Sequence, residues 1–253
     1  MLTRWKALLS AVAVIGVGAL AVVGWMVFAP ASDPFSAEEM FHLGRVNTSA
    51  VTTYKFTTDA RFTVHTEGGP EHQEFHTEAT VVVDEGMHVT WTENGRYGET
   101  LLLDGAQYHR ESDAGAWEEW SPPGSWPAAP NFPSPRDHFQ ILDGLTDVSH
   151  EGQEVLRGVR VNKVTGNVDT ARQVREAWGD EVAGGGGDLR AQMLAGTVTV
   201  AAWVGAEDGL LHAYTMEGSF PAVGEAFAYQ YSMETRFSHF NEPLELPSPN
   251  AVR

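Results

Sequence analysis

The chain has no cysteine among its 253 residues. Disulfide bonds, thiolate nucleophiles, zinc sites built on cysteine and lipid attached through cysteine are therefore excluded. A domain that lacks disulfides must be held together by its hydrophobic core, and a chain of this length can bury one.

Basic residues are also few, since 16 Lys and Arg stand against 34 Asp and Glu and give a formal net charge of −18. Proteins that bind nucleic acid need basic patches to meet the phosphates, so we expect no nucleic-acid partner. Broad adhesion to anionic lipid head groups is disfavoured for the same reason. The acidity itself mainly favours solubility.

The motifs that mark common catalytic sites are missing. The sequence contains no Gly-x-Ser-x-Gly elbow, no Gly-x-Gly-x-x-Gly after a predicted strand and no P-loop. The glycines of residues 184–187 precede Asp188, whose carboxylate would repel phosphate. We therefore expect neither an enzyme nor a cofactor.

Histidines offer one alternative to this expectation. His72 and His76 have the spacing of a metal-binding pair only on a helix; on a strand they lie about 13 Å apart. We therefore expect no metal site there. A compact cluster of His65, His76 and His88 across neighbouring strands would instead favour an enzymatic site.

The longest hydrophobic run covers residues 7–28 and has no charged side chain. A helix of this length reaches about 33 Å, enough to cross the bilayer core of about 30 Å. Arg4 and Lys6 precede the run and Asp33 follows it, so the N-terminus is expected in the cytoplasm. A cleaved signal peptide is the alternative, because residues 29–31 resemble a cleavage site, although its apolar core is usually shorter.

Two regions follow from this run. Residues 1–31 are predicted to be a cytoplasmic stub with a transmembrane anchor, or a signal peptide. Residues 32–253 are predicted to form one extracytoplasmic domain. The protein is then a single-pass membrane protein that contacts the cell membrane through residues 7–28, or a secreted protein if the signal is cleaved.

Most of the external region alternates with the period of β-strands. Ser36 and Glu39 form a capping box that opens a short helix, and from Tyr54 apolar side chains recur at every second position. In the last strand Phe227, Tyr229, Tyr231, Met233 and Phe237 share one face. Strands are expected at residues 54–64, 75–83, 87–92, 100–104, 107–111, 147–151, 158–168, 198–204, 211–220 and 226–240.

Other segments interrupt the strands. Residues 121–135 hold six prolines and are expected to be a surface loop, because proline removes sheet hydrogen bonds. Asp169 can cap a helix that runs to Trp178, and a short helix is expected between Asp188 and Gly196. The fold class is therefore α+β with a large antiparallel sheet built as a meander.

The many aromatic residues fit either a solid core or an apolar ligand cavity. A curved sheet with helices over its concave face forms such a cavity readily. The expected lining combines one face of the predicted sheet with the apolar stripe of the first helix. It consists of Met40, Leu43, Phe56, Phe62, Val81, Met87, Val89 and Trp91.

Three stretches resemble the mycobacterial-type LppX/LprG lipoprotein family. They are residues 158–169, residues 200–210 with a Trp203 strand and a Glu207-Asp208-Gly209 turn, and residues 231–247, which contain the run 237–243. The resemblance extends over most of residues 36–250 and is clearest after residue 145. It implies a LolA-like fold, a half-open β-barrel whose helices cover a hydrophobic cavity.

The resemblance also implies carriage of lipids or lipoprotein tails without catalysis. The expected function is therefore binding of a lipid or acyl chain outside the cytoplasm, for transfer of lipids or lipoproteins at the cell envelope. One departure matters: members of this family are tethered through a lipidated cysteine, which this chain lacks. A membrane-anchored envelope sensor or protein-interaction module with the same fold, acting through an envelope protein partner, is the alternative.

Overall fold

The computed structural model describes residues 36–104, 106–111, 115–119, 145–172, 187–224 and 227–249. The hydrophobic run of residues 7–28 and the proline-rich stretch of residues 121–135 lie outside these ranges. Within them, no helix has both the length and the apolar character needed to cross a membrane.

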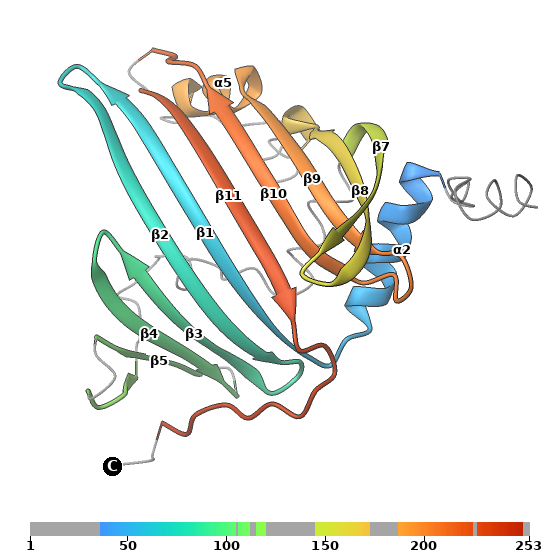
Figure 1. Cartoon of the computed structure of the whole chain (residues 1–253). Helices are drawn as coiled ribbons and strands as arrows, with labels where there is room; N and C mark the ends of the chain where they lie inside the picture. The colour runs from blue at the N-terminus through green and yellow to red at the C-terminus, as the bar shows by residue number, and fades with distance from the viewer. Residues whose placement is uncertain are drawn as a thin grey trace, which may run out of the picture. The chain divides into compact units, whose positions relative to one another are not determined.

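The described strands form one antiparallel sheet of eleven strands, in the order β6-β5-β4-β3-β2-β1-β11-β10-β9-β8-β7 (Figure 1). The strands are β1 (Thr53–Thr66), β2 (Gly69–Val82), β3 (Gly86–Glu93), β4 (Arg96–Leu103), β5 (Ala106–Arg110), β6 (Glu118–Glu119), β7 (Leu145–Leu156), β8 (Val159–Val168), β9 (Thr197–Gly205), β10 (Leu211–Phe220) and β11 (Ala228–Ser238). The predicted antiparallel sheet is confirmed.

The sheet consists of two meanders joined side by side. Strands β1 to β6 are neighbours in chain order, and so are β7 to β11. The join is the antiparallel pair β1–β11, in which Phe56 faces Phe237 and Phe62 faces Tyr231. Alternation within each strand predicts the meanders, but it carries no information about which edges of the two meanders meet.

Turn chemistry sets the register of the first meander. Asn94 and Gly95 connect β3 to β4 with positive φ angles of 48° and 82°, as expected for the tight turn that this dipeptide favours. The turn between β1 and β2 is shorter than the sequence suggests, because β2 already begins at Gly69. Pro70 is tolerated near the start of that strand, where it faces His65.

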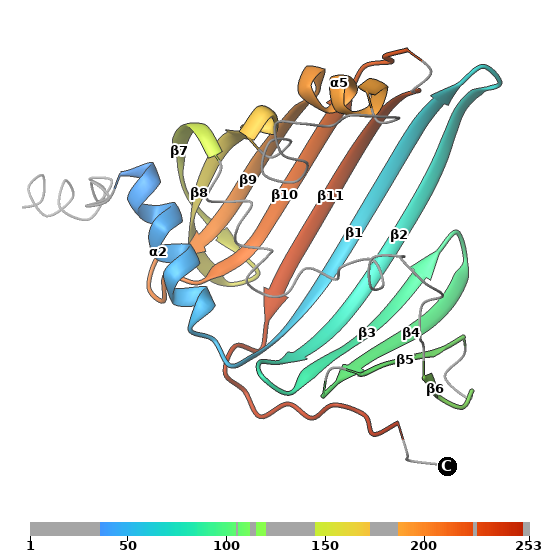
Figure 2. The ribbon, with the colours of Figure 1, turned by 180° about the vertical axis from the view of Figure 1, so that it is seen from behind.

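In the described ranges, two α-helices pack on one side of the sheet (Figure 2). Helix α2 (Ala37–Ser49) begins at the predicted capping box, in which Ser36 accepts from the Glu39 amide at 3.2 Å. The helix is tied to β10 by the Thr48 hydroxyl, which accepts a hydrogen bond of 2.9 Å from the Leu211 amide. Helix α5 (Gly187–Ala195) lies near the end of β10, where the Gln192 amide donates to the carbonyl oxygen of Pro221 at 2.8 Å.

The helix predicted from Asp169 is described only at its start. The Asp169 carboxylate accepts from the Arg172 amide at 2.9 Å, as an N-cap does, and the residues from 173 to 186 lie outside the described ranges.

The two sides of the sheet differ in chemistry. One side carries the core, in which apolar residues from both meanders and from α2 form a single cluster. We call it the apolar face; its buried members include Phe56, Val81, Val89, Val200 and Ala202. The opposite side, which we call the polar face, carries Asp59, Arg61, Glu74 and His76 on the central strands.

Candidate functional site

Most of the residues predicted to line a binding surface lie on the apolar face. Phe56 faces Ala79 across β1 and β2, Ala79 faces Val89 on β3, and Val81 faces Met87 directly. Successive side chains of a strand point to opposite faces, so residues two apart follow the same side. The predicted residues that share the apolar face are Phe56, Phe62, Val81, Met87, Val89 and Trp91.

The two predicted helix residues lie over the other half of the sheet. Helix α2 contacts β7 to β10, whereas Met87, Val89 and Trp91 belong to β3. Met40 is buried within the core cluster, while Leu43 is half-buried and lies outside it. The structure therefore distributes the predicted residues over both meanders instead of gathering them at one point.

One end of the apolar face is tightly packed. The ring of Tyr54 lies 6.3 Å from that of Phe56 and 6.0 Å from that of Phe237. Tyr214 adds a fourth ring, 6.0 Å from Phe237. All four side chains are buried, so this end is a solid core in the free protein.

The other end of the apolar face is more open and carries five aromatic rings. Phe62 contacts Phe75 edge-to-face at 5.6 Å and Tyr231 at 5.9 Å, and Tyr229 stacks on Phe220 at 4.4 Å. Only Phe220 is buried; the other rings are half-buried. We call Phe62, Phe75, Phe220, Tyr229 and Tyr231 the aromatic band.

The sequence placed only Phe62 of this band among the candidate site residues. Alternation predicts that Tyr229 and Tyr231 share a strand face, but only the pairing of β1 with β11 brings Tyr231 against Phe62. The close fit of Tyr231 to the sheet also depends on a glycine, because a Cβ at Gly218 would lie 2.2 Å from its ring. Phe227, grouped with them from the sequence, lies outside β11 and is exposed.

Three tyrosine hydroxyls on the apolar face lack an oxygen or nitrogen acceptor. The Tyr231 hydroxyl donates to the sulfur of Met216 at 3.0 Å, and that of Tyr229 donates to the sulfur of Met193 at 3.3 Å. A thioether sulfur is a weak acceptor. The Tyr54 hydroxyl is buried and has no hydrogen-bond partner.

Burial also fixes the charge state of these hydroxyls. It raises the pKa of Tyr231 to about 12 and raises the pKa of Tyr54 and Tyr229 above the ordinary value of 10.0. All three side chains are therefore neutral hydrogen-bond donors at physiological pH.

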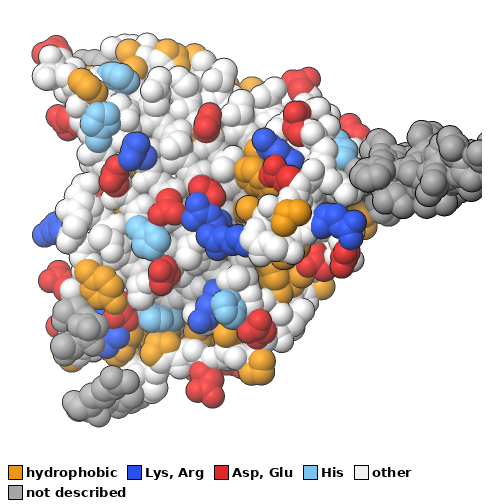
Figure 3. Space-filling view, viewed as in Figure 1, with side chains coloured by type: hydrophobic (Ala, Val, Ile, Leu, Met, Phe, Trp, Pro, Cys, Tyr) orange, Lys and Arg blue, Asp and Glu red, His pale blue; other side chains and the backbone are white. Residues whose placement is uncertain are grey.

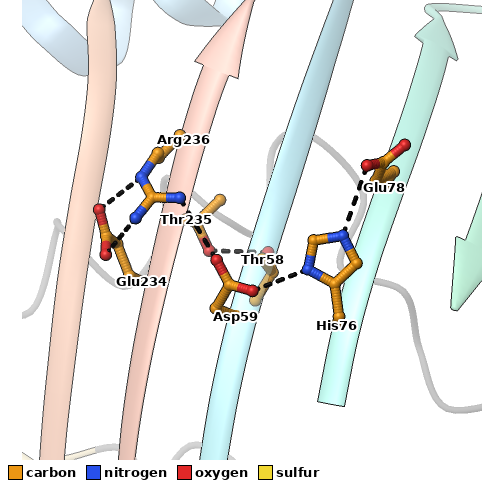
Figure 4. Close-up of polar contacts among 7 residues, drawn as sticks. All are labelled: Thr58, Asp59, His76, Glu78, Glu234, Thr235 and Arg236. Atoms are coloured by element: carbon orange, nitrogen blue, oxygen red, sulfur yellow. Dashed lines mark hydrogen bonds and ion pairs between the residues drawn. The ribbon is translucent and has the colours of Figure 1, made fainter. Parts of the chain in front are cut away.

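Two threonine side chains form a small polar patch in the middle of the apolar face. The hydroxyls of Thr58 and Thr235 lie 2.9 Å apart on the neighbouring strands β1 and β11 (Figure 4). Tyr214 also hydrogen-bonds with Thr235. These bonds satisfy the hydroxyls. The polar patch therefore lies between the packed end and the aromatic band and leaves no free donor.

The polar face carries a row of ion pairs. Asp59 bonds to His76 at 2.7 Å and to Arg236 at 3.3 Å, and Arg236 also pairs with Glu234 (Figure 4). The hydrogen bond to Asp59, followed by that to Glu78, raises the pKa of His76 above its ordinary value despite an opposing effect of burial. Charged and histidine side chains are spread over this whole face (Figure 3).

A depression on this face is also polar. It has a volume of about 650 Å³ and is bordered by Asp59, Arg61, Glu74 and His76. Three of its carboxylates pair with Arg or His side chains: Glu74 with Arg61 at 2.6 Å, Asp59 with His76 and Arg236, and Glu234 with Arg236. The chemistry of this depression suits water and ions better than an acyl chain.

The histidines do not form the compact cluster that would favour an enzymatic site. Asp59 on β1 faces His76 on β2. His65 lies six positions further along β1, about 20 Å from Asp59. His88 bonds instead to Glu99 at 2.7 Å. Among the residues that the structure describes, no three His, Asp or Glu side chains are placed to share a metal ion.

Glu99 is a buried carboxylate on the β3–β5 part of the polar face and is 2% exposed. It accepts hydrogen bonds from Tyr97 at 2.6 Å, from Arg110 at 2.7 and 2.8 Å, and bonds to His88. Burial alone would raise its pKa, but the bonds from Arg110, Tyr97 and His88 together hold the pKa of Glu99 below its ordinary value. The guanidinium of Arg110 lies 4.5 Å from the ring of Trp117, which covers the cluster.

No protein-family model matches the chain, and no curated protein matches its sequence. Solved structures do show similarity. LprF from Mycobacterium bovis aligns with a TM-score of 0.47 and 12% identity, covering 84% of this chain and 96% of that one. The lipoprotein LppX from Mycobacterium tuberculosis aligns with a TM-score of 0.42 and 12% identity, covering 85% of this chain and 100% of that one.

A LolA superfamily protein from Nitrosomonas europaea aligns with a TM-score of 0.32 and 7% identity, covering 84% of this chain and 96% of that one. The structural similarity to LppX-type and LolA superfamily proteins that the sequence motifs suggested is therefore found over most of the chain, at low sequence identity.

Proposed function

We propose that this protein binds a lipid or another lipophilic acyl chain on the apolar face of its sheet, outside the cytoplasm and without catalysis. In this proposal the sheet acts as a half-open barrel whose helices cover the ligand. Residues 7–28 hold the domain at its own membrane, where it transfers or presents the bound lipid at the cell envelope.

The aromatic band is the observation that carries the proposal. Its half-buried rings continue the packed core along the same face, so apolar surface remains available beside a closed core. Sites for small apolar ligands are lined mainly by aromatic and aliphatic side chains. The adjacent Met193, Met216 and Met233 are flexible and can adapt their shape to an acyl chain.

The chemistry of the two faces supports the choice of this side. The polar face presents ion pairs, which an acyl chain would have to desolvate at a cost in free energy. The apolar face presents Phe62, Phe75 and Tyr231, whose contact with an acyl chain releases water from both partners. The residues predicted from the sequence, from Met40 to Trp91, extend this proposed lining into the core.

A photoreactive fatty acyl probe tests the proposal on the full-length protein in lipid vesicles. After illumination, mass spectrometry should find the probe attached to peptides from the aromatic band. Replacing Phe62 by Gln removes the ring between Phe75 and Tyr231. Contact with one phenylalanine ring contributes about 1.5–3 kcal/mol, so labelling should need about tenfold or more probe.

Thr63→Gln is the matched control, because Thr63 is the next residue of β1 and points to the polar face. It should leave labelling unchanged, since its hydroxyl bonds only to His72 on the exposed side. Labelling that maps to the polar face, or that is equally sensitive to both substitutions, would contradict the proposal.

A further inference from the structure

Tyr54 combines deep burial with an unused hydrogen-bond donor. It is 2% exposed and lies between Phe56 and Phe237 at the packed end of the apolar face. Its hydroxyl is buried as well, yet no acceptor lies within hydrogen-bond distance. Buried tyrosine hydroxyls usually have a partner, so this donor is unusual within a well-packed core.

Tyr214 provides the comparison within the same cluster. It is 1% exposed, points to the same face, and its hydroxyl is hydrogen-bonded with Thr235. The two tyrosines therefore differ in hydrogen bonding while they share burial and aromatic neighbours. The missing partner of Tyr54 is a property of its position and does not follow from aromatic packing in general.

An unsatisfied buried donor destabilises the free protein, because the hydroxyl has lost its hydrogen bond to water and gained none. Phenylalanine would fill the same space without this cost. A bound molecule that brings an acceptor atom to Tyr54 recovers the lost hydrogen bond only in the complex. Such a donor therefore favours ligands that carry the acceptor over those that do not, by about the value of one net hydrogen bond.

The surroundings restrict the charge of the acceptor. The described neighbours of Tyr54 on this face are apolar: it faces Val81 on β2 and lies against the rings of Phe56 and Phe237. A carboxylate or phosphate beside these side chains would be buried in apolar surroundings, which is costly. An uncharged oxygen, as in an ester, amide or ether, has no such cost.

Building on the proposed function, we infer that the Tyr54 hydroxyl donates a hydrogen bond to an uncharged acceptor oxygen of the bound lipophile. Tyr54 is then a specificity-determining residue: it selects chains that carry a neutral oxygen over plain hydrocarbons. The rings of Phe56 and Phe237 must separate from Tyr54 to admit the oxygen, so binding loosens the packed end.

Competition against the photoreactive acyl probe tests this inference on the full-length protein in vesicles. The competitors are a long-chain fatty acid methyl ester and the alkane of matched length. Wild type should prefer the ester by about five- to tenfold, the value of one net hydrogen bond. Tyr54→Phe should lose that preference while binding the alkane as before. Comparing variants in the same vesicles cancels the partitioning of each competitor into the bilayer.

Tyr214→Phe is the control, since it removes a hydroxyl that already has a partner, and it should retain the preference for the ester. Urea unfolding adds a second readout: Tyr54→Phe should be at least as stable as wild type, and Tyr214→Phe less stable. An ester preference that survives Tyr54→Phe overturns the donor role alone. Failure of both competitors to displace the probe from wild type overturns the proposed function together with the inference.

Discussion

Replacing Glu99 by Gln tests whether the buried ion cluster holds the β3–β5 part of the sheet. The substitution keeps the shape of the side chain but removes the charge that faces Arg110 and bonds to Tyr97 and His88. Breaking a buried ion pair from one side costs about 3–5 kcal/mol, because the other charge stays buried. The amide retains one acceptor oxygen, so we expect the free energy of unfolding to fall by about 3 kcal/mol, near the lower end of this range.

Urea unfolding of the full-length protein in detergent micelles, followed by circular dichroism, measures this loss. The matched control is Glu74→Gln, the same change in the pair with Arg61, whose side chains are 64% and 65% exposed. Exposed pairs contribute about 0–1 kcal/mol, so the control should differ little from wild type. A Glu99→Gln variant as stable as Glu74→Gln would refute the reasoning.

The pH dependence of unfolding supplies an independent check. The folded-state pKa of Glu99 is lowered, so its contribution to stability is present above the unfolded-state pKa of about 4.3. That contribution is lost as the pH falls through the folded-state pKa. The difference in stability between wild type and Glu99→Gln should therefore shrink in acid, whereas a difference that is constant with pH would point to packing alone.

Two further predictions concern the faces of the sheet. The pKa of His76 is raised, so its contribution to stability is present below the unfolded-state pKa of about 6.5 and is lost as the pH rises through the folded-state pKa. NMR titration of the ring measures that folded-state pKa in the wild type. Urea unfolding across about pH 6–9 should show the loss of stability in the wild type and not in His76→Gln. Gly218→Ala places a methyl group against the ring of Tyr231 and should cost about 1–3 kcal/mol by overpacking, with weaker labelling by the acyl probe. Unchanged stability and labelling in Gly218→Ala would show that Tyr231 moves freely.

Local patterns in the sequence predict most of the strands. The alternation from Tyr54 onward and the Asn94-Gly95 turn each act over a few residues, and both appear in the structure as predicted. A short motif predicts the start of the first helix equally well, because the Ser36–Glu39 capping box is formed by residues three apart. Such features depend on backbone geometry within one element and need no tertiary information.

The aromatic band could not be predicted in the same way. Phe62 and Tyr231 meet only because β1 pairs with β11, and their separation in the chain leaves no periodic signal. The same holds for Glu99, because His88 and Arg110 reach it only through the pairing of β4 with β3 and β5. The turn between β1 and β2 also differs from the predicted one, since β2 starts at Gly69 and includes Pro70 and His72.

The pairing of β1 with β11 has a consequence for the order in which the domain folds. Strand β1 pairs on its second edge with β11, the last strand in the chain. Hydrogen bonds of Asn241 with Thr52 and Thr53 stabilise this pairing. Each meander can assemble from local contacts as it emerges, but the contact across the join must wait for nearly the whole chain. Completion of the core is thus a late event, and until then the edge of β1 needs protection from other chains.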